Sequence, residues 1–276
     1  MQPKLKKVGL VLGGGAARGM AHIGVLDILE QEGIPIDMIA GTSAGAAVGA
    51  LYAHGRAASE IVSIALDLER HRLARFIDPS LPRSGFIKGK KIKDLIASFI
   101  GGDIKFSDLK IPFACVAADI DTGEEVVIDR GSVPDAVRAS ISIPGVFTVV
   151  RKGERYLVDG VLVNPVPVNV VKHMGASFII AVNVIPDLAD RTHHRVGEKR
   201  VGSSKEPNLI HIMMQSIYIG TYSLVRHSLE ETDVVIEPHV NHIGAGDFHQ
   251  AQECIRLGRL AARSVMPEIK QAIKNL

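Results

Sequence analysis

The residue best placed to do chemistry is Ser43, at the centre of Gly41-Thr42-Ser43-Ala44-Gly45. This G-x-S-x-G pattern separates a stretch with strand character from one with helix character, a placement that carries more information than the letters themselves. Glycines two residues away on either side permit a sharp turn that exposes the serine hydroxyl at a sheet edge, beside a helix N-terminus. The pattern therefore predicts a nucleophilic serine, and a helix N-cap serine is the alternative.

A second glycine-rich turn, Gly13-Gly14-Gly15-Ala16-Ala17-Arg18-Gly19, follows the first apolar stretch of the chain. If the strands before the two turns are neighbours in a parallel sheet, both turns lie at the same edge. Backbone N–H groups of this loop could then face a phosphate or the oxyanion of an acyl-transfer intermediate. A dinucleotide site is the competing interpretation, but Arg18 or Ala16 replaces a required glycine in either register.

Apolar periodicity predicts the elements that position these turns. Strands are expected at 7–12, 36–40, 111–118, 126–129, 147–150, 155–158, 177–184 and 233–237, and helices at 17–32, 44–54, 165–174, 209–229 and 248–276. The alternation of strand and helix at the start predicts an α/β fold, with a mostly parallel but mixed central sheet and helices on both faces. One domain over 1–276 is expected, with a helical C-terminal part over 209–276 and a polar loop or lid over 186–208.

A serine nucleophile needs a base, and the position of Ser43 argues against the α/β-hydrolase arrangement with a histidine. That fold places several strands before its nucleophile, whereas only one strand-helix unit and the nucleophile's own strand fit before Ser43. Among the 11 histidines, His22 lies on the first helix, and His193 and His194 lie in the polar loop. Each is interpreted as a solvated or capped histidine.

These residues together resemble the patatin-like phospholipases, serine lipid acyl hydrolases that work with a Ser-Asp dyad. The resemblance covers roughly 8–172 and rests on the loop at 13–19, on 41–45 and on Asp159-Gly160 within 156–167. The segment 139–147 is also similar to the Ser- and Pro-containing segment that precedes the family's catalytic aspartate. The resemblance implies a three-layer sandwich fold and hydrolysis of phospholipid or lysophospholipid esters. A regulatory or lipid-binding protein that keeps this fold with negligible turnover is the alternative.

The resemblance also assigns roles to single residues. It implies Ser43 as nucleophile, Asp159 as its base, and an oxyanion hole formed by the backbone of Gly13, Gly14, Gly15 and Ala16. Arg18 occupies a position where the family usually has Arg or Lys, and is expected to position the loop or an anionic headgroup, with a salt bridge at the helix start as the alternative. The chain departs from the family at Ala16, which replaces a common glycine, and at Val161, where Gly or Ala is more frequent.

The chemistry of the implied dyad is reasonable by itself. A free aspartate has a pKa of about 3.9 and is a weak base, so Asp159 is expected in an apolar setting that raises its proton affinity. Val158 and Val161 on either side fit this expectation. The reaction requires no metal and no cofactor.

Composition and charge restrict the partners. A net charge of +2 and an aromatic content of 4% without Trp argue against nucleic acid. Between 70 and 93, eight Lys and Arg stand against Asp78 alone, so the segment from Arg70 to Lys93 could rest on an anionic membrane, with a solvated basic surface as the alternative.

Other segments bear on localisation. No apolar run is long enough to span a bilayer, and the apolar stretch at the N-terminus is too short for a signal peptide. Cys115 and Cys254 form no disulfide framework and are expected to be reduced core residues. A cytoplasmic protein is expected, with peripheral membrane contact as an option.

Overall fold

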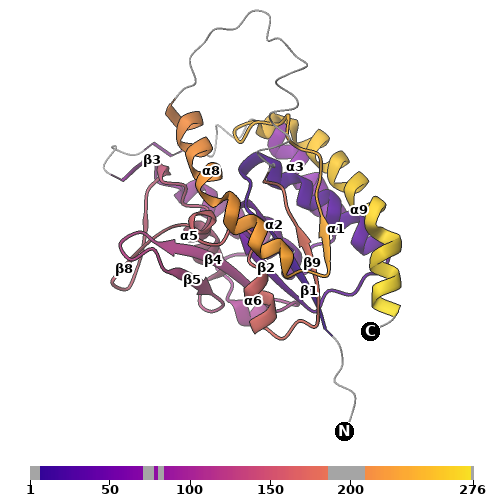
Figure 1. Ribbon diagram of the computed structural model, residues 1–276. Helices are drawn as coiled ribbons and strands as arrows, with labels where there is room; N and C mark the ends of the chain where they lie inside the picture. The colour runs from indigo at the N-terminus through magenta and orange to yellow at the C-terminus, as the bar shows by residue number, and fades with distance from the viewer. Residues whose placement is uncertain (1–6, 71–77, 80–83, 186–208, 275–276) are drawn as a thin grey trace, which may run out of the picture.

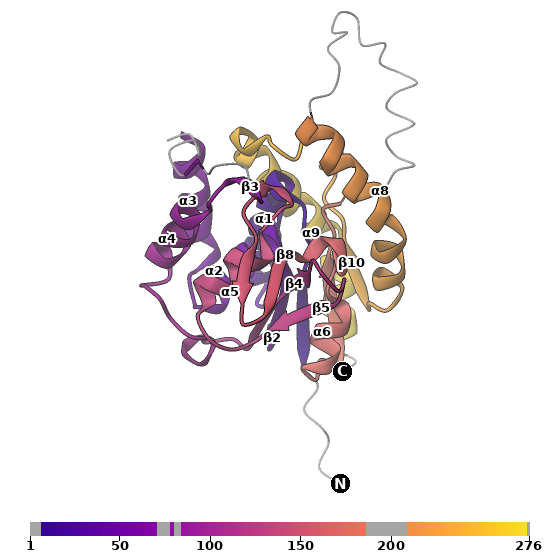
Figure 2. The ribbon, with the colours of Figure 1, turned by 90° about the vertical axis from the view of Figure 1, so that its left-hand side faces the viewer.

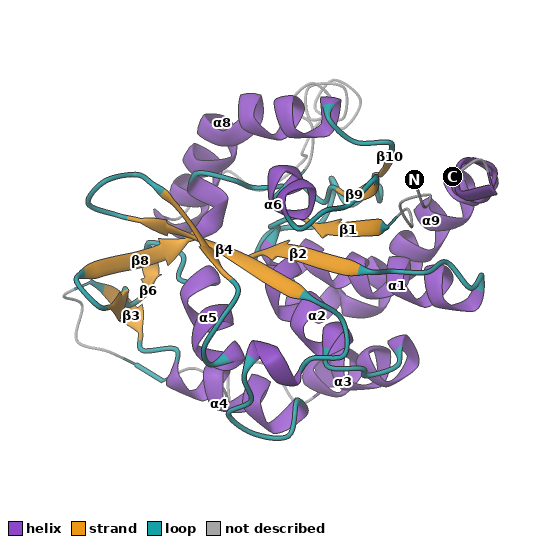
Figure 3. Cartoon of the chain, turned by 90° about the horizontal axis from the view of Figure 1, so that it is seen from below, coloured by secondary structure: helices purple, strands orange, loops and turns teal. Residues whose placement is uncertain are grey.

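The computed structural model describes residues 7–70, 78–79, 84–185 and 209–274. A twisted central sheet separates two layers of helices, with α6 (Val168–His173) and α8 (Leu209–Glu230) on one face and α1 (Ala21–Gln31) and α2 (Ala44–Ala53) on the other (Figures 1 and 3). The fold is therefore the predicted α/β arrangement of three layers. The predicted lid at 186–208 lies outside the described residues, as do 71–77 and 80–83 of the basic segment.

The sheet is mixed, as predicted, and its strand order is β10-β9-β1-β2-β4-β8-β7, with β5 paired to β4. The parallel strands are β1 (Val8–Leu12), β2 (Met38–Thr42), β4 (Phe113–Asp119), β9 (Phe178–Val182) and β10 (Val234–Ile236). The antiparallel strands are β5 (Glu125–Ile128), β7 (Val150–Lys152) and β8 (Arg155–Asp159). Because β1 and β2 are parallel neighbours with Leu12 opposite Gly41, both glycine turns leave the sheet at the same edge.

The sheet buries side chains on both faces, which explains why its inner strands are continuously apolar. On β1, Leu10 and Leu12 pack in the layer that contains α1 and α2, while Val11 packs in the layer that contains α6 and α8. Cys115 and Cys254 are buried free thiols, as expected. None of the described helices is long and apolar enough to cross a membrane.

Helix boundaries follow local signals. Gly33, Gly55 and Gly175 adopt positive φ angles of 66°, 99° and 99° directly after helices, as their positions predicted. The predicted helix at 17–32 begins instead with a 3-10 helix, η1 (Ala16–Met20), before α1. The predicted helix at 248–276 likewise divides into η5 (Phe248–Gln250) and α9 (Ala251–Lys274).

Several elements between β2 and α6 were not predicted. They are α3 (Ala58–Arg70), β3 (Gly85–Ile87), α4 (Lys90–Phe99), η3 (Phe106–Asp108), α5 (Val133–Ser140) and η4 (Gly160–Leu162). The strand predicted at 147–150 is wrong as one element, because β6 (Gly145–Phe147) pairs with β3 in a separate sheet while β7 joins the main sheet. In Figure 2, α3, α4 and α5 gather on the side of the sheet opposite α8.

Candidate active site

Ser43 occupies a strained turn between β2 and α2. Its φ and ψ angles are 54° and −119°, and only 4% of its surface is exposed. A Cβ at Gly41 would lie 2.6 Å from the carbonyl oxygen of Gly45, and a Cβ at Gly45 would collide with the carbonyl of Leu12. Both flanking glycines are therefore required by close backbone packing, the physical reason that the sequence suggested. The Ser43 hydroxyl makes no N-cap hydrogen bond to α2.

The Ser43 hydroxyl instead donates a hydrogen bond to Asp159. The Oγ–Oδ2 distance is 2.6 Å, although the two residues are 116 positions apart in the chain. Asp159 ends β8 with 1% exposure, and its other oxygen, Oδ1, accepts the Val161 N–H at 2.9 Å. Burial raises the pKa of Asp159 from 3.8 to about 7, against the lowering effect of both hydrogen bonds. A carboxylate with this pKa can accept a proton near neutral pH.

Ser140, which has no role in the expected dyad, fixes the serine turn from the side. Its Oγ accepts the Ser43 N–H at 2.9 Å and donates to the carbonyl oxygen of Val116 on β4 at 2.6 Å. The Asp159 N–H bonds to the carbonyl oxygen of Ser142 at 2.9 Å. The Ser-rich segment that the sequence singled out thus connects to both halves of the Ser-Asp pair.

The first two glycines of the loop use their N–H groups inside the fold. The Gly13 N–H donates to the carbonyl oxygen of Val182 at 3.0 Å, and the Gly14 N–H donates to that of Pro165 at 2.9 Å. These two amides, expected to belong to an oxyanion hole, therefore anchor the loop to its neighbours. Of the four residues expected to form the oxyanion hole, only Gly15 and Ala16 remain as candidates.

Gly15 and Ala16 have the N–H groups that can still serve an oxyanion. Within the part of the chain that the structure describes, neither amide has a backbone acceptor. The loop lies against the serine, since a Cβ at Gly14 would be 3.5 Å from the Cβ of Ser43. Ala16 adopts a φ of 51°, which L-residues rarely do, so the loop holds an unusual shape where the family's common glycine is absent.

His22 supports this loop from behind. It is fully buried on α1, and its Nε2 lies 2.7 Å from the carbonyl oxygen of Gly13. Because a carbonyl oxygen only accepts, Nε2 carries the proton in this bond. Burial lowers the pKa of His22 to about 4, so its ring is neutral at pH 7. Of the interpretation of His22 as a solvated or capped histidine, the solvated part is wrong, because His22 is a core residue whose ring is hydrogen-bonded to the loop.

Arg18 connects the loop to the opposite layer. Its side chain is 4% exposed, its Nε donates to the carbonyl oxygen of Ile243 at 2.7 Å, and its guanidinium lies 5.3 Å from the ring centre of Tyr218 on α8. Burial lowers the pKa of Arg18 from its ordinary value. These contacts join the loop to α8 and pack the charged group inside the protein.

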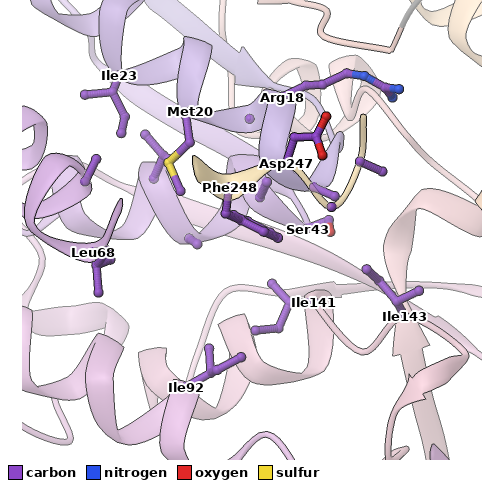
Figure 4. Close-up of a pocket in the computed structure, with 18 of the residues that line it drawn as sticks. Arg18, Met20, Ile23, Ser43, Leu68, Ile92, Ile141, Ile143, Asp247 and Phe248 are labelled. Atoms are coloured by element: carbon purple, nitrogen blue, oxygen red, sulfur yellow. The ribbon is translucent and has the colours of Figure 1, made fainter. Parts of the chain in front are cut away.

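Ser43 lies in the wall of a cavity of about 950 Å³. In Figure 4, Arg18 and Asp247 lie on the same side as Ser43, while Ile23, Leu68 and Ile92 lie across the cavity. The walls are mostly apolar, as in sites for apolar ligands. Among the described residues, no group of His, Cys, Asp and Glu has the arrangement of a metal site.

Comparisons with known proteins agree with this geometry. A family model described as Patatin-like phospholipase matches residues 10–172. An uncharacterized NTE family protein of Mycobacterium tuberculosis (strain CDC 1551 / Oshkosh) is 32% identical over 283 residues, covering 95% of this chain and 46% of that protein. Lysophospholipase NTE1 of Debaryomyces hansenii is 29% identical over 289 residues, covering 98% of this chain and 18% of that protein. The chain spans less than half the length of these two relatives.

A solved structure is similar as well. VipD from Legionella pneumophila superposes with a TM-score of 0.49 at 11% identity, covering 96% of this chain and 67% of that chain. The family match takes in the glycine loop, Ser43 and Asp159, and it extends over more than half of the 276 residues. On this match, the chain belongs to the patatin-like phospholipase family.

Proposed function

We propose that this protein is a serine ester hydrolase that acts on the acyl chains of phospholipid or lysophospholipid. The observation that carries the proposal is the 2.6 Å hydrogen bond from the Ser43 hydroxyl to Asp159, a buried carboxylate whose pKa is raised to about 7. An ordinary aspartate would be too weak a base near neutral pH, and burial removes that difficulty.

In the proposed reaction, Ser43 Oγ attacks the ester carbonyl carbon while its proton passes to Asp159 Oδ2. The N–H groups of Gly15 and Ala16 donate to the oxyanion that forms. The tetrahedral intermediate collapses, and the leaving alcohol takes the proton from Asp159. Water then gives a proton to Asp159 and attacks the acyl-enzyme, and the same proton returns to Ser43 as the fatty acid leaves.

Two further observations support a lipid substrate. The cavity beside Ser43 is mostly apolar, which suits an acyl chain better than a polar group. One relative, which this chain matches over 18% of its length, is named a lysophospholipase. Together they favour an ester of a long acyl chain over a small polar ester.

Contact with an anionic membrane is part of the same proposal. In the described part of the basic segment, Phe86 on β3 is 55% exposed, and Lys88, Lys90 and Lys91 follow it closely. Asp78 bonds to the N–H groups of Gly89 and Lys90 at the start of α4. An exposed aromatic ring beside lysines is suited to an anionic lipid surface. Flotation with anionic vesicles, and no flotation with neutral ones, is expected.

The test combines labelling with turnover. A fluorophosphonate probe is expected to label the wild type and not Ser43→Ala, while Ser63→Ala, an exposed serine on α3, labels normally. On a panel of phospholipids and lysophospholipids, Asp159→Asn is expected to lower kcat by about 10²- to 10⁴-fold, the range of a general base. Full activity in Asp159→Asn would reject Asp159 as the general base. A folded wild type that is not labelled by the probe and hydrolyses none of the lipids would favour the lipid-binding alternative.

A further inference from the structure

The cavity beside Ser43 is bounded by three helices that share one pattern. Each contributes four apolar residues at positions i, i+3, i+4 and i+7, the spacing that places side chains on one face of a helix, and α3 also contributes Glu69. The apolar residues are Ala44, Ala47, Val48 and Leu51 of α2, Ile61, Ile64, Ala65 and Leu68 of α3, and Ile92, Leu95, Ile96 and Phe99 of α4.

We infer that these three faces form a channel for a single unbranched acyl chain, and that α2 sets the chain length that the site accepts. The inference rests on the proposed function, which it deepens. All twelve side chains are apolar, so these three helix faces offer no hydrogen-bond partner to a headgroup, and Glu69 lies beside them next to Leu68. It therefore suits the acyl part of the ester, and the alcohol part lies on the side of Ser43, Arg18 and Asp247 (Figure 4).

Because α2 begins next to Ser43, positions along this helix measure the distance from the nucleophile. Ser43 precedes α2, and the Ala47 N–H donates to the carbonyl oxygen of Ser43 at 3.1 Å, so Ala47 lies one turn beyond the nucleophile. Leu51 lies one further turn away, about 12 Å from Ser43 at the α-helical rise. An acyl chain attached at Ser43 would therefore extend alongside Ala47 before it reaches Leu51.

Side-chain size along α2 increases with distance from the nucleophile. Ala44 and Ala47 are half-buried, whereas the larger Val48 and Leu51 are 7% and 8% exposed. The small residues leave room beside the reacting carbonyl, and the larger ones narrow the channel farther on. Each methylene that enters improves binding by about fourfold, so selectivity is expected to rise with chain length until the channel is full.

The experiment uses two variants and a series of p-nitrophenyl esters from acetate to palmitate. Ala47→Leu obstructs the channel one turn from Ser43 and is expected to lower kcat/KM for the palmitate ester at least tenfold more than for the acetate ester. Leu51→Phe obstructs the channel one turn later and is expected to lower kcat/KM only for the esters with the longest acyl chains. Ala57→Leu, a half-buried alanine outside the cavity lining, is the matched control.

A binding measurement separates this inference from the proposed function. A fluorescent long-chain fatty acid is expected to bind the wild type at least tenfold more tightly than Ala47→Leu, whether or not the protein hydrolyses esters. Absence of ester hydrolysis by the wild type, with this binding difference intact, would reject the proposed function and keep the channel. Equal loss for short and long esters in folded Ala47→Leu, or equal fatty-acid binding, would overturn the channel.

Discussion

The two sides of the cavity are built in different ways. Around Ser43, polar groups are held by directional bonds, including Ser43 to Asp159, the Ser43 N–H to Ser140, and the Gly13 carbonyl to His22. Across the cavity, α3 and α4 present side chains that are apolar except for Glu69, and the apolar ones contribute through their volume. The proposed ester cleavage needs fixed atoms, whereas an acyl chain needs only space. The proposed catalytic side, around Ser43, is therefore expected to respond to loss of single bonds, and the helical side, formed by α3 and α4, to changes of size.

The largest effect on the catalytic side concerns the proton of Asp159. Its pKa is raised to about 7 in the folded protein, while the carboxyl of the unfolded chain titrates near 3.8. Between these values the folded state holds a proton that the unfolded state has lost, so the free energy of unfolding falls as pH rises through this window. Asp159→Asn has no such proton and is expected to gain stability relative to wild type by a few kcal/mol between pH 4 and pH 8.

Urea denaturation at both pH values measures this difference. Asp129→Asn, which removes a carboxylate that is 65% exposed, is the control and should show a much smaller pH-dependent change. In the wild type, kcat/KM is expected to rise with pH and level off above about 7, because the base must be deprotonated. An equal stability difference at the two pH values would contradict the buried, proton-binding carboxylate on which the catalytic side depends.

The sharp turn at Ser43 could be predicted from the sequence because its backbone geometry restricts the residue types that fit. A positive φ at Ser43 and the close packing at Gly41 and Gly45 permit few residue types, so the G-x-S-x-G pattern predicts this turn without a structure. The hydrogen bonds that anchor the Gly13 and Gly14 N–H groups could not be predicted from the sequence, because their acceptors, the carbonyl oxygens of Val182 and Pro165, lie far along the chain.

The helical side was missed for another reason. The stripes of α3 and α4 are present in the sequence, but a stripe of apolar residues does not say whether it faces a core or a cavity. The roles of His22 and Ser140 depend on partners that only the folded chain brings to them. Packing between distant segments thus decided both the shape of the cavity and the support of the glycine loop.

The next effect tests the support of the glycine loop. His22→Ala removes the donor to the Gly13 carbonyl and is expected to lower kcat by about tenfold, less than the 10² to 10³ of a direct oxyanion donor. His22→Gln keeps a donor and is expected to recover most of this loss, with KM nearly unchanged in both variants. His173→Ala, an exposed histidine that also lies 2.7 Å from a backbone carbonyl, is the control. If folded His22→Ala keeps the wild-type kcat, His22 does not support catalysis through the glycine loop.

The smallest effect belongs to the helical side of the cavity. Leu68 on α3 is only half-buried and borders the existing cavity, so Leu68→Ala enlarges a space that is already open, and a loss of about 1 kcal/mol or less is expected in the free energy of unfolding. Leu26 on α1 has 0% exposure, and Leu26→Ala is expected to lose about 2–5 kcal/mol because it leaves a new void. Urea denaturation compares the two variants. Equal losses would mean that Leu68 is packed as tightly as the core. The helical side would then not be a loosely packed wall, and the contrast between the two sides of the cavity would be weaker.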